Sequence, residues 1–278
     1  MSILNIIYSD NNCIIRNLEN FDLSQTLDCG QAFRWNKDEN GYWSGIAKGT
    51  FLKAKQTDKE LIFYNTDKNT FENVWKDYFD FGRDYSLPLV HTHRHNFLEA
   101  AAEFGKGIHI LKQDPWEALC SFIISQNNNI PRIKGIVERL CSNFGDKCNG
   151  GYTFPSAKTL SRLTVNELSV LRSGFRAKYI LDAAKKVANN TINLDEITNM
   201  PTNDARNELI KIYGVGAKVA DCTLLFGMGH MDAFPKDVWI NRAIEVLFNG
   251  ELPEQNCEYA GIIQQYIFYY ARETKLEI

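Results

Sequence analysis

The sequence lacks the features that mark membrane, secreted and disulfide-rich proteins. No apolar run is long enough to span a bilayer, and the first residues carry neither a basic segment nor a small-residue cleavage site. The seven cysteines are scattered, and none forms a Cys-x-x-Cys pair. We therefore expect an intracellular protein with reduced thiols, without a disulfide framework or a zinc site.

An excess of positive charge is also missing, since the 278 residues carry a formal net charge of -3. Proteins that bind nucleic acid usually show a basic balance, so such a function would require segregated charge. Residues 132–139, 172–186 and 211–218 are locally basic, whereas acidic residues gather in the amino-terminal part and at 251–258. A charge run is usually only a solvated face, so this pattern permits a nucleic-acid partner without indicating one.

The first part of the chain has the pattern of an antiparallel sheet. Turn signals such as Asn40-Gly41 separate short runs rich in Phe, Tyr, Trp and Ile. The predicted strand runs are residues 13–23, 31–36, 42–47, 50–55 and 60–65. Residues 71–81 and 96–104 look helical, and the connector 82–95 is poor in periodicity.

From Gln113 onward the chain has an almost wholly helical pattern, which opens with the N-cap and proline of Asp114-Pro115. The predicted helices are 116–125, 130–144, 177–189, 205–213, 216–226, 237–248 and 258–272. We therefore predict an α+β fold, with an antiparallel β-rich domain over residues 1–108 and a helical bundle over 109–278.

A His-x-His-x-His run at residues 91, 93 and 95 raises the question of a metal site. Alternation within a loop fixes no common facing geometry, and no cysteine or carboxylate partner is evident. We interpret these residues as solvated loop histidines and predict no metal site formed by side chains.

The tetrapeptide Tyr213-Gly214-Val215-Gly216 separates two helical patterns and predicts a helix-hairpin-helix. Glycine tolerates positive φ, and the amides at the start of the second helix could face an anionic phosphate. We therefore predict that Gly214 and Gly216 let the hairpin hold a nucleic-acid backbone without reading its sequence.

Lys218 is expected in the first turn of the second helix, where the positive end of the helix dipole disfavours a cation. The neutral amine that this favours can attack an electrophilic carbon and form a Schiff base. Asp237 follows nineteen positions later, where it could be a simple N-cap.

The segment GVGAKVADC, followed by a Pro-x-Asp-Val motif, resembles the helix-hairpin-helix-GPD superfamily of DNA glycosylases. The resemblance implies that Lys218 is the nucleophile at the sugar C1′ and that Asp237 supports the cationic transition state. The cysteine ladder of the cluster-containing members is missing. A hairpin lysine in an unrelated DNA-binding module is the alternative.

Residues 29–35, CGQAFRW, narrow the resemblance to the 8-oxoguanine DNA glycosylases, where the matching glycine carbonyl recognises the base. Guanine N7 accepts a hydrogen bond, whereas 8-oxoguanine carries N7–H, so a carbonyl of Gly30 would attract the lesion and repel guanine. A β-turn glycine without a function is the alternative reading.

Residues 125–132, SQNNNIPR, resemble the loop that in this family fills the hole left by an everted nucleotide. The resemblance implies that Asn127 fills the hole, that Arg132 and Arg176 contact the orphaned cytosine, and that Phe175 is the wedge. Such groups are suited to offset the cost of extruding a nucleotide. An asparagine-rich helix terminus is the alternative.

Gln264 and Phe268 lie four residues apart and so share one face of a predicted helix. By resemblance they read the Watson-Crick edge of the lesion and stack on its ring, with Cys222 as the opposite wall. The alternative is that Phe268 and Cys222 are core residues.

The sequence departs from better-known family members at two positions. Tyr213 stands where a proline is common, which could loosen the hairpin, and Trp239 stands where a histidine is often found. The resemblance also implies a structural monovalent cation at the carbonyls of Ile210, Ile212 and Val215.

The sequence thus predicts a bifunctional 8-oxoguanine DNA glycosylase and AP lyase. We expect it to be a monomer that requires no cofactor and is cytoplasmic or nucleoid-associated. Its expected partner is duplex DNA with 8-oxoguanine opposite cytosine. A monofunctional glycosylase for alkylated bases and a non-catalytic DNA-binding protein are the alternatives, and the first leaves Lys218 and Gly30 unexplained.

Overall fold

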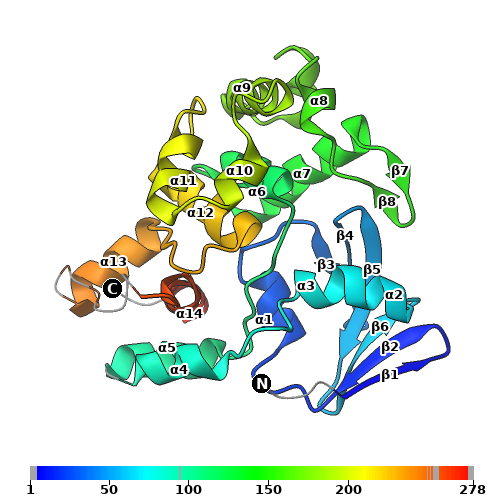
Figure 1. Cartoon of the computed structure of the whole chain (residues 1–278), viewed down its shortest axis with the longest axis vertical. Helices are drawn as coiled ribbons and strands as arrows, with labels where there is room; N and C mark the ends of the chain where they lie inside the picture. The colour runs from blue at the N-terminus through cyan, green and yellow to red at the C-terminus, as the bar shows by residue number, and fades with distance from the viewer. Residues whose placement is uncertain (1–4, 94, 249, 251, 253–256, 275–278) are drawn as a thin grey trace. The chain divides into compact units, whose positions relative to one another are not determined.

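The structure, a computed structural model, describes residues 5–93, 95–248, 250, 252 and 257–274 (Figure 1). The chain forms two compact units, each assembled from separate segments. The first unit contains residues 1–31, 54–112 and 230–278, and the second contains residues 32–53 and 113–229. Both the predicted amino-terminal sheet and the predicted helices are present, which confirms the α+β class.

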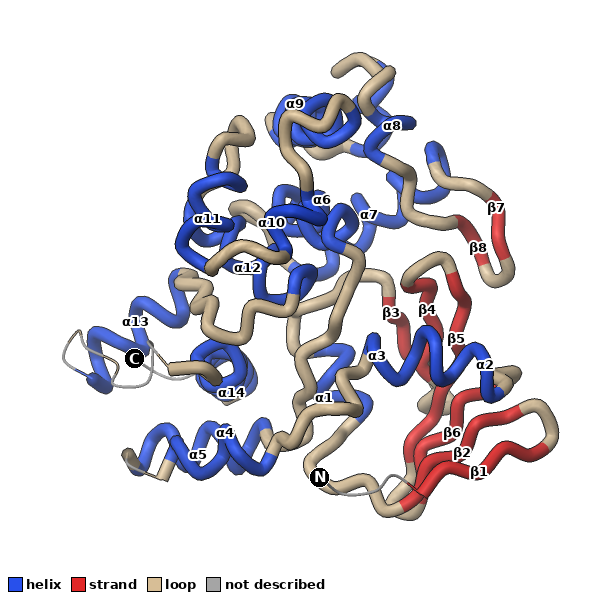
Figure 2. The backbone as a smooth tube through the Cα atoms, in the orientation of Figure 1, coloured by secondary structure: helices blue, strands red, loops and turns tan. Residues whose placement is uncertain are grey.

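Six strands form one sheet in the order β1-β2-β6-β5-β4-β3, drawn in red in Figure 2. The pairs β1–β2, β2–β6 and β3–β4 are antiparallel. The strands are β1 Asn5–Ser9, β2 Asn12–Arg16, β3 Trp35–Lys37, β4 Trp43–Ala47, β5 Thr50–Gln56 and β6 Glu60–Tyr64. Strand β5 passes from the second unit to the first between Lys53 and Ala54.

Strands β2 to β6 arise from the predicted runs, but three details differ. Strand β1 was not predicted. The first predicted run, residues 13–23, forms a strand only as far as Arg16, and its last residue, Leu23, begins helix α1 Leu23–Asp28. Asp22 caps α1 by accepting the N–H of Gln25 at 2.7 Å. Strand β3 begins only at Trp35, because the residues before it form the turn that contains Gly30.

The helices of the first unit are α1, α2 Lys68–Thr70, α4 Ser86–Thr92, α5 Asn96–Gly105, α13 Val238–Phe248 and α14 Ala260–Glu273. A π-helical turn, η1 Phe71–Trp75, joins α2 to α3 Lys76–Tyr78. Helix α4 lies in the connector for which no helix was predicted, and Pro88 is within it.

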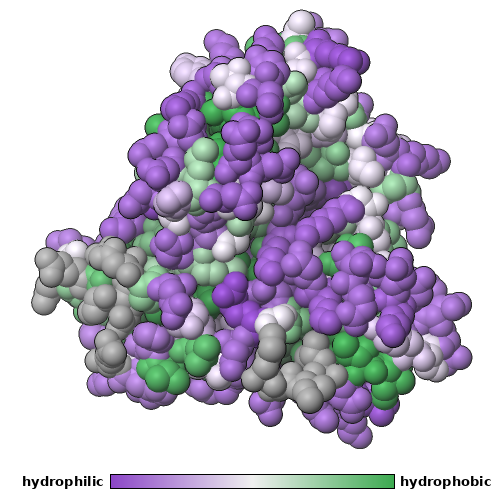
Figure 3. All heavy atoms as spheres, viewed as in Figure 1, coloured by the Kyte–Doolittle hydropathy of each residue, from purple (hydrophilic) through white to green (hydrophobic). Residues whose placement is uncertain are grey.

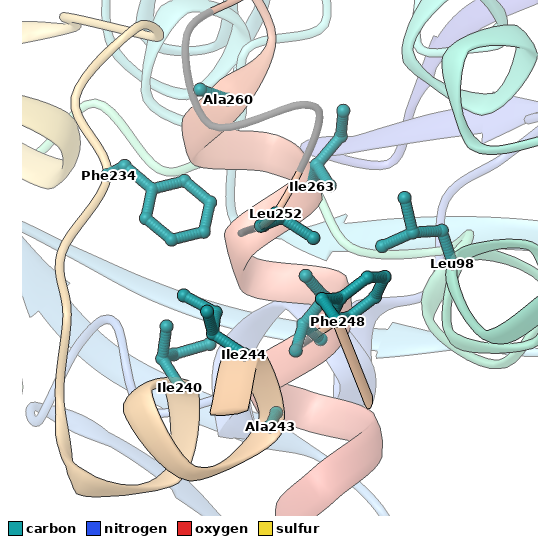
Figure 4. Packing of buried hydrophobic residues seen from close by; sticks show 10 residues of the cluster. Leu98, Phe234, Ile240, Ala243, Ile244, Phe248, Leu252, Ala260 and Ile263 are labelled. Atoms are coloured by element: carbon teal, nitrogen blue, oxygen red, sulfur yellow. The ribbon is translucent and has the colours of Figure 1, made fainter. Parts of the chain in front are cut away.

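A buried apolar cluster joins α5, α13 and α14 (Figure 4). Ile240 and Ala243 of α13 and Ile263 of α14 are fully buried in it, with Leu98 from α5. Phe234 comes from the segment before α13. This packing fixes the start of α13, where Asp237 lies.

The second unit is built around α6 Pro115–Ser125, which is buried along most of its length. Helices α7 Ile130–Phe144, α9 Arg176–Ala188 and α12 Ala217–Met228 contact α6. An all-round apolar helix is expected at the centre of a bundle. The remaining elements are β7 Lys147–Cys148, β8 Gly151–Tyr152, α8 Ala157–Leu160, the 3-10 turn η2 Glu167–Leu171, α10 Leu194–Thr198 and α11 Thr202–Ile210.

Each compact unit takes residues from both sides of the predicted boundary after residue 108. That division of the sequence therefore stays a prediction. Within the described ranges, no helix combines the length and apolar character needed to cross a bilayer. Hydrophilic residues cover most of the face shown in Figure 3.

Candidate active site

The predicted site residues divide between the two units. The second unit contains Asn127, Arg132, Phe175, Arg176, Gly214, Gly216, Lys218 and Cys222. The first unit contains Gly30, Asp237, Gln264 and Phe268.

The predicted helix-hairpin-helix consists of α11 and α12. Gly214 has φ +81°, and a Cβ there would lie 2.4 Å from the ring of Tyr179, so only glycine fits. Gly216 has φ -102° and ψ -180°, an extended conformation that any residue adopts. The expected use of positive φ therefore holds at Gly214 and not at Gly216.

Gly216 has no side chain, so the surface at the start of α12 is open to an approaching ligand. It is the N-cap of α12, it supplies no capping side chain, and a Cβ on it would meet nothing within 4 Å. The first amides of a helix have no partner within the helix. Those of α12 follow exposed Gly216 and Ala217, so the geometry suits an approaching anion.

A partly buried ion pair joins the two helices of the hairpin. Arg206 Nε of α11 lies 2.5 Å from Asp221 Oδ1 of α12, and the Asp221 residue is buried. A second guanidinium nitrogen of Arg206 donates to Asn203 Oδ1 at 2.6 Å. Sequence reasoning missed this pair, although a buried acid in an apolar helix needs a cationic partner.

Lys218 and Cys222 lie one turn apart on α12 and therefore share a helix face. The Lys218 side chain is half-buried, and its Nζ is 5.4 Å from the centre of the Phe122 ring. Within the part of the chain that the structure describes, no carboxylate pairs with this amine. Cys222 is buried at 3% exposure. A potential nucleophile and a small apolar surface thus stand side by side.

In the asparagine-rich loop between α6 and α7, one asparagine caps a helix and another is exposed and could contact DNA. Asn129 is the N-cap of α7, since its Oδ1 accepts the N–H of Arg132 at 3.0 Å. Asn127 is exposed and has φ +46°, and no described residue holds its side chain by a hydrogen bond. Arg132 is exposed on the first turn of α7.

Arg176 is buried at 3% exposure and holds the backbone of this loop. Its guanidinium donates to the carbonyls of Gln126, of Asn127 at 2.8 Å and of Ser173 at 3.1 Å. Its predicted contact with an orphaned base stays a prediction. Phe175, just before it, is 49% exposed and lies against the guanidinium at 4.5 Å.

In the first unit, Gly30 lies in a turn whose two neighbouring residues, Cys29 and Gln31, are fixed by hydrogen bonds. Gly30 has φ +85°, and the carbonyl of Cys29 accepts Gln265 Nε2 at 2.7 Å. The fully buried Gln31 side chain bonds to backbone atoms of Thr26, His109 and Leu111. No described residue donates to the carbonyl of Gly30, so a rigid turn presents a carbonyl with free acceptor capacity.

Adjacent glutamines on α14 differ in their bonding. Gln265 holds the Gly30 turn, whereas Gln264 is buried at 4% exposure and its Oε1 lacks a hydrogen-bond partner within the described residues. A buried acceptor without a donor is costly, which points to a ligand as its partner. Phe268 lies one turn further along α14 and is half-buried.

Asp237 is the N-cap of α13, as the simpler sequence interpretation proposed. Its Oδ1 accepts the N–H of Ile240 at 2.8 Å, and its carbonyl accepts the N–H of Asn241 at 2.9 Å. The side chain is half-buried. These bonds fix the carboxylate without excluding a second role for it.

The three histidines at 91, 93 and 95 contact different groups, and His91 lies within α4 rather than in the predicted loop. His93 Nδ1 lies 3.0 Å from Glu99, His95 caps α5, and the His91 ring lies 5.3 Å from the ring of Tyr259. No group of metal-binding side chains occurs among residues 5–93, 95–248, 250, 252 and 257–274.

The sequence matches two family models in succession. Residues 13–119 match the 8-oxoguanine DNA glycosylase amino-terminal domain, and residues 120–256 match the HhH-GPD superfamily of base excision DNA repair proteins. The chain belongs to the 8-oxoguanine DNA glycosylase family.

Solved structures of this glycosylase family resemble the whole chain. A Clostridium acetobutylicum 8-oxoguanine glycosylase/lyase, bound to DNA with cytosine opposite 8-oxoguanine, is 37% identical with a TM-score of 0.91, covering 99% of each chain. A structure of MBOgg1 with a low-affinity DNA ligand is 40% identical with a TM-score of 0.93, covering 99% of this chain and 100% of that one.

A curated relative, the N-glycosylase/DNA lyase of Saccharomyces cerevisiae, is 34% identical over 251 residues, which are 79% of this chain and 66% of the relative. Relatives from Methanothermobacter thermautotrophicus and Arabidopsis thaliana are matched over 64% of their length. The chain thus spans just under two thirds of the length of these curated relatives.

This glycosylase family member is exposed at both positions where its sequence departs from the expected pattern. Tyr213 is 61% exposed beside the hairpin, and Trp239 is 39% exposed in the first turn of α13. Both substitutions therefore change the surface of the protein rather than its core.

Proposed function

We propose that this protein is a bifunctional DNA glycosylase and AP lyase that removes 8-oxoguanine from duplex DNA. The placement of Lys218 carries the proposal. It lies in the first turn of α12, next to amides that no side chain caps and one turn before buried Cys222. A backbone phosphate on the amides would bring a neighbouring sugar to the amine.

In the first step the neutral amine of Lys218 attacks the sugar C1′. The bond from C1′ to the base nitrogen breaks, and its electron pair leaves with the base, which takes up a proton. Positive charge develops on the sugar, and the carboxylate of Asp237 stabilises it. The N-cap bond to Ile240 supports this role, because it holds one carboxylate oxygen in place.

In the second step the C1′ adduct opens to a Schiff base between Lys218 and the sugar. A proton leaves C2′, a double bond forms between C2′ and C3′, and the C3′–O bond breaks with its electrons on the 3′ phosphate. Water then hydrolyses the Schiff base and restores the amine. The strand is cleaved by β-elimination.

Base recognition would use Gly30 and Gln264. The free acceptor capacity of the Gly30 carbonyl suits N7–H of 8-oxoguanine, and the unpartnered Oε1 of Gln264 suits the donors on the Watson-Crick edge. Phe268 and Cys222 would cover the two faces of the ring. A site built around one hydrogen bond can reject the analogue that lacks it by roughly 10⁴-fold.

The orphaned base would be met by the loop before α7. We propose that exposed Asn127 fills the space of the everted nucleotide, that Phe175 is the wedge, and that Arg132 contacts the orphaned cytosine. Arg176, at the start of α9, would contribute beside this loop, whose carbonyls it holds. Excision measured opposite each of the four bases tests the preference, and equal rates would contradict it.

No cofactor enters this chemistry, and the protein would act as a monomer on DNA. The hairpin carbonyls of Ile210, Ile212 and Val215 are the proposed ligands of a monovalent cation. The Ile212 carbonyl accepts the N–H of Val215 at 3.0 Å, which leaves a second lone pair for a cation. DNA affinity measured in potassium and in a bulky organic cation at equal ionic strength tests this proposal.

Borohydride trapping tests the assignment of the nucleophile. The wild-type protein should form a covalent adduct with a duplex containing 8-oxoguanine, and Lys218→Gln should form none. Lys185→Gln is the matched control, since Lys185 is an exposed lysine on α9. An adduct with Lys218→Gln, or none with the wild type, would overturn the assignment.

The two alternatives predict different products. A glycosylase for alkylated bases would act on methylated duplex and leave the strand intact, whereas a non-catalytic binding protein would show salt-dependent binding and no product. Excision assays on oxidised and methylated duplexes, with and without alkaline cleavage of the product, separate all of these functions.

A further inference from the structure

One face of α9 holds the turn of the hairpin. Asp182 Oδ2 accepts the backbone N–H of Tyr213 at 2.7 Å, and Lys186 Nζ donates to the carbonyl of Lys211 at 2.7 Å. Lys186 and Asp182 also pair with each other at 2.9 Å. Asp182 and Lys186 are four residues apart, so they lie on one face of α9, and this face is hydrogen-bonded to the turn.

An aromatic contact between α9 and the turn adds to these hydrogen bonds. The ring of Tyr179 lies against Gly214, where a Cβ would be only 2.4 Å from its Cγ atom. The Tyr213 ring meets Tyr179 edge-on, with centroids 5.0 Å apart and planes at 87°. The Phe175 ring also contacts Tyr179, with centroids 5.6 Å apart and planes at 66°. Edge-to-face pairs of this kind are favourable beyond the area that they bury.

The outer rings of this row are exposed, at 61% for Tyr213 and 49% for Phe175, and the middle ring is half-buried. The row therefore runs from the turn before α9 to the hairpin on the surface of the second unit. It links the proposed wedge to the proposed phosphate-binding amides through one rigid helix.

The bond from Tyr213 to Asp182 requires a backbone N–H. Proline, the residue that the family resemblance leads us to expect at position 213, has none. The departure from the expected sequence thus supplies a donor, and Asp182 supplies a charged acceptor for it. Hydrogen bonds to charged groups are stronger than those between neutral groups.

We propose that Tyr179, Asp182 and Tyr213 form a clamp that positions the hairpin relative to Phe175. This proposal rests on the proposed function, because it assigns the clamp to the DNA-binding step. The clamp holds the amides of α12 and the wedge at a fixed separation before DNA arrives. Binding then needs less ordering of the turn, which raises affinity without a new contact.

The test measures affinity for a duplex that carries a tetrahydrofuran abasic analogue, which the enzyme cannot cleave. Asp182→Ala should weaken binding about tenfold, the loss expected for one charged hydrogen bond. Tyr213→Pro should weaken it to a similar extent. The double variant should bind no more weakly than Tyr213→Pro alone, because the proline already removes the bond that Asp182→Ala removes.

Rescue and kinetics separate positioning from general loss of structure. Asp182→Asn keeps an acceptor while losing the ion pair with Lys186, so it should bind within about twofold of the wild type if the bond to Tyr213 is what matters. In single-turnover excision, Asp182→Ala should raise the half-saturating enzyme concentration about tenfold and leave the maximal rate nearly unchanged. If the proline variant does not fold, the affinity of Asp182→Ala alone decides the outcome. Tyr213→Ala keeps the N–H and removes only the ring, so it measures the aromatic contact with Tyr179 separately.

Additive losses in the double variant, or unchanged affinity of Asp182→Ala, would overturn the clamp. Exposed Asp195→Ala on α10 is the control for removing an acidic residue from the second unit. Failure of the clamp is distinguishable from failure of the proposed function. A wild type that excises 8-oxoguanine while Asp182→Ala binds normally rejects only the clamp. A wild type that neither excises nor traps rejects the function, whatever the binding shows.

Discussion

The carboxylate of Asp237 accepts the backbone N–H of Ile240 at 2.8 Å, so the proposed catalytic acid residue also caps α13. A cap satisfies an orphan donor and places negative charge at the positive end of the helix. Capping and chemistry are therefore two demands on one side chain. A pair of substitutions can separate them.

Asp237→Asn should abolish excision with little loss of stability, because asparagine caps helices about as well as aspartate but carries no charge. Asp237→Ala should abolish excision and also lower the free energy of unfolding by about 1 kcal/mol. Urea unfolding and single-turnover excision measure the two effects. If Asp237→Asn kept most of the activity, the carboxylate would be a cap alone.

Gln264→Met should make the protein at least as stable as the wild type while impairing excision of 8-oxoguanine. The buried Oε1 of Gln264 has no donor within the described residues, and leaving such an atom unsatisfied costs about 1–3 kcal/mol. Methionine fills a similar volume without a polar atom. Thermal unfolding and excision rates are the measurements.

The adjacent Gln265 provides the matched control for this prediction. Its Nε2 donates to the carbonyl of Cys29 at 2.7 Å, so Gln265→Met should destabilise the protein. A Gln264→Met protein that is clearly less stable than the wild type would show that Oε1 already has a partner.

Asn127→Gly and Asn127→Ala should lose excision equally and differ in stability. Asn127 has φ +46°, where glycine is unstrained and alanine costs about 1–2 kcal/mol. Both substitutions remove the amide that would fill the space of the everted nucleotide. Urea unfolding should therefore give a lower free energy of unfolding for Asn127→Ala than for Asn127→Gly, while the excision rates of the two variants should be similarly low. Full activity in the glycine variant would remove Asn127 from the proposed mechanism.

The sequence predicted the elements whose signal is local. The runs that became β2 to β6, the Asp114-Pro115 start of α6 and the glycine turn at 214 follow from periodicity, capping and φ preference. Helix α4 was missed, because the apolar spacing around Pro88 is weak. The short pair β7–β8 was missed, because two-residue strands carry almost no pattern.

Sequence motifs predicted the residues of the candidate site. The residues that fix the backbone around them were identified only in the structure. Gln31 and Gln265 fix the Gly30 turn, and Arg176 fixes the carbonyls of the Asn127 loop. Such bonds join residues far apart in the sequence, so no local pattern encodes them. A buried polar residue between apolar neighbours, such as Gln265 on α14, is the one sequence signal that could have suggested them.

His109 should make the protein less stable as the pH falls below about 6.5. The imidazole is buried, its Nδ1 donates to the carbonyl of Phe79 at 2.9 Å, and its ring stacks on Tyr85 with centroids 3.8 Å apart. Burial lowers the pKa of His109 from 6.5 to about 4, although the carbonyl of Phe79 and the charge of Asp80 oppose the shift. Between these pH values the imidazole of His109 is protonated in the unfolded chain and neutral in the folded protein. Stability is therefore complete above the unfolded pKa and falls as the pH drops toward the folded pKa, by at most about 1.4 kcal/mol per pH unit.

The comparison with His109→Asn isolates this effect, because other titrating groups contribute equally to both proteins. The advantage of the wild type in free energy of unfolding should be largest at pH 7 and should shrink steadily from pH 6.5 to 4.5. Urea unfolding at several pH values measures the difference. A constant difference over that range would mean that the imidazole titrates alike in both states, which its burial against Phe79 and Tyr85 argues against.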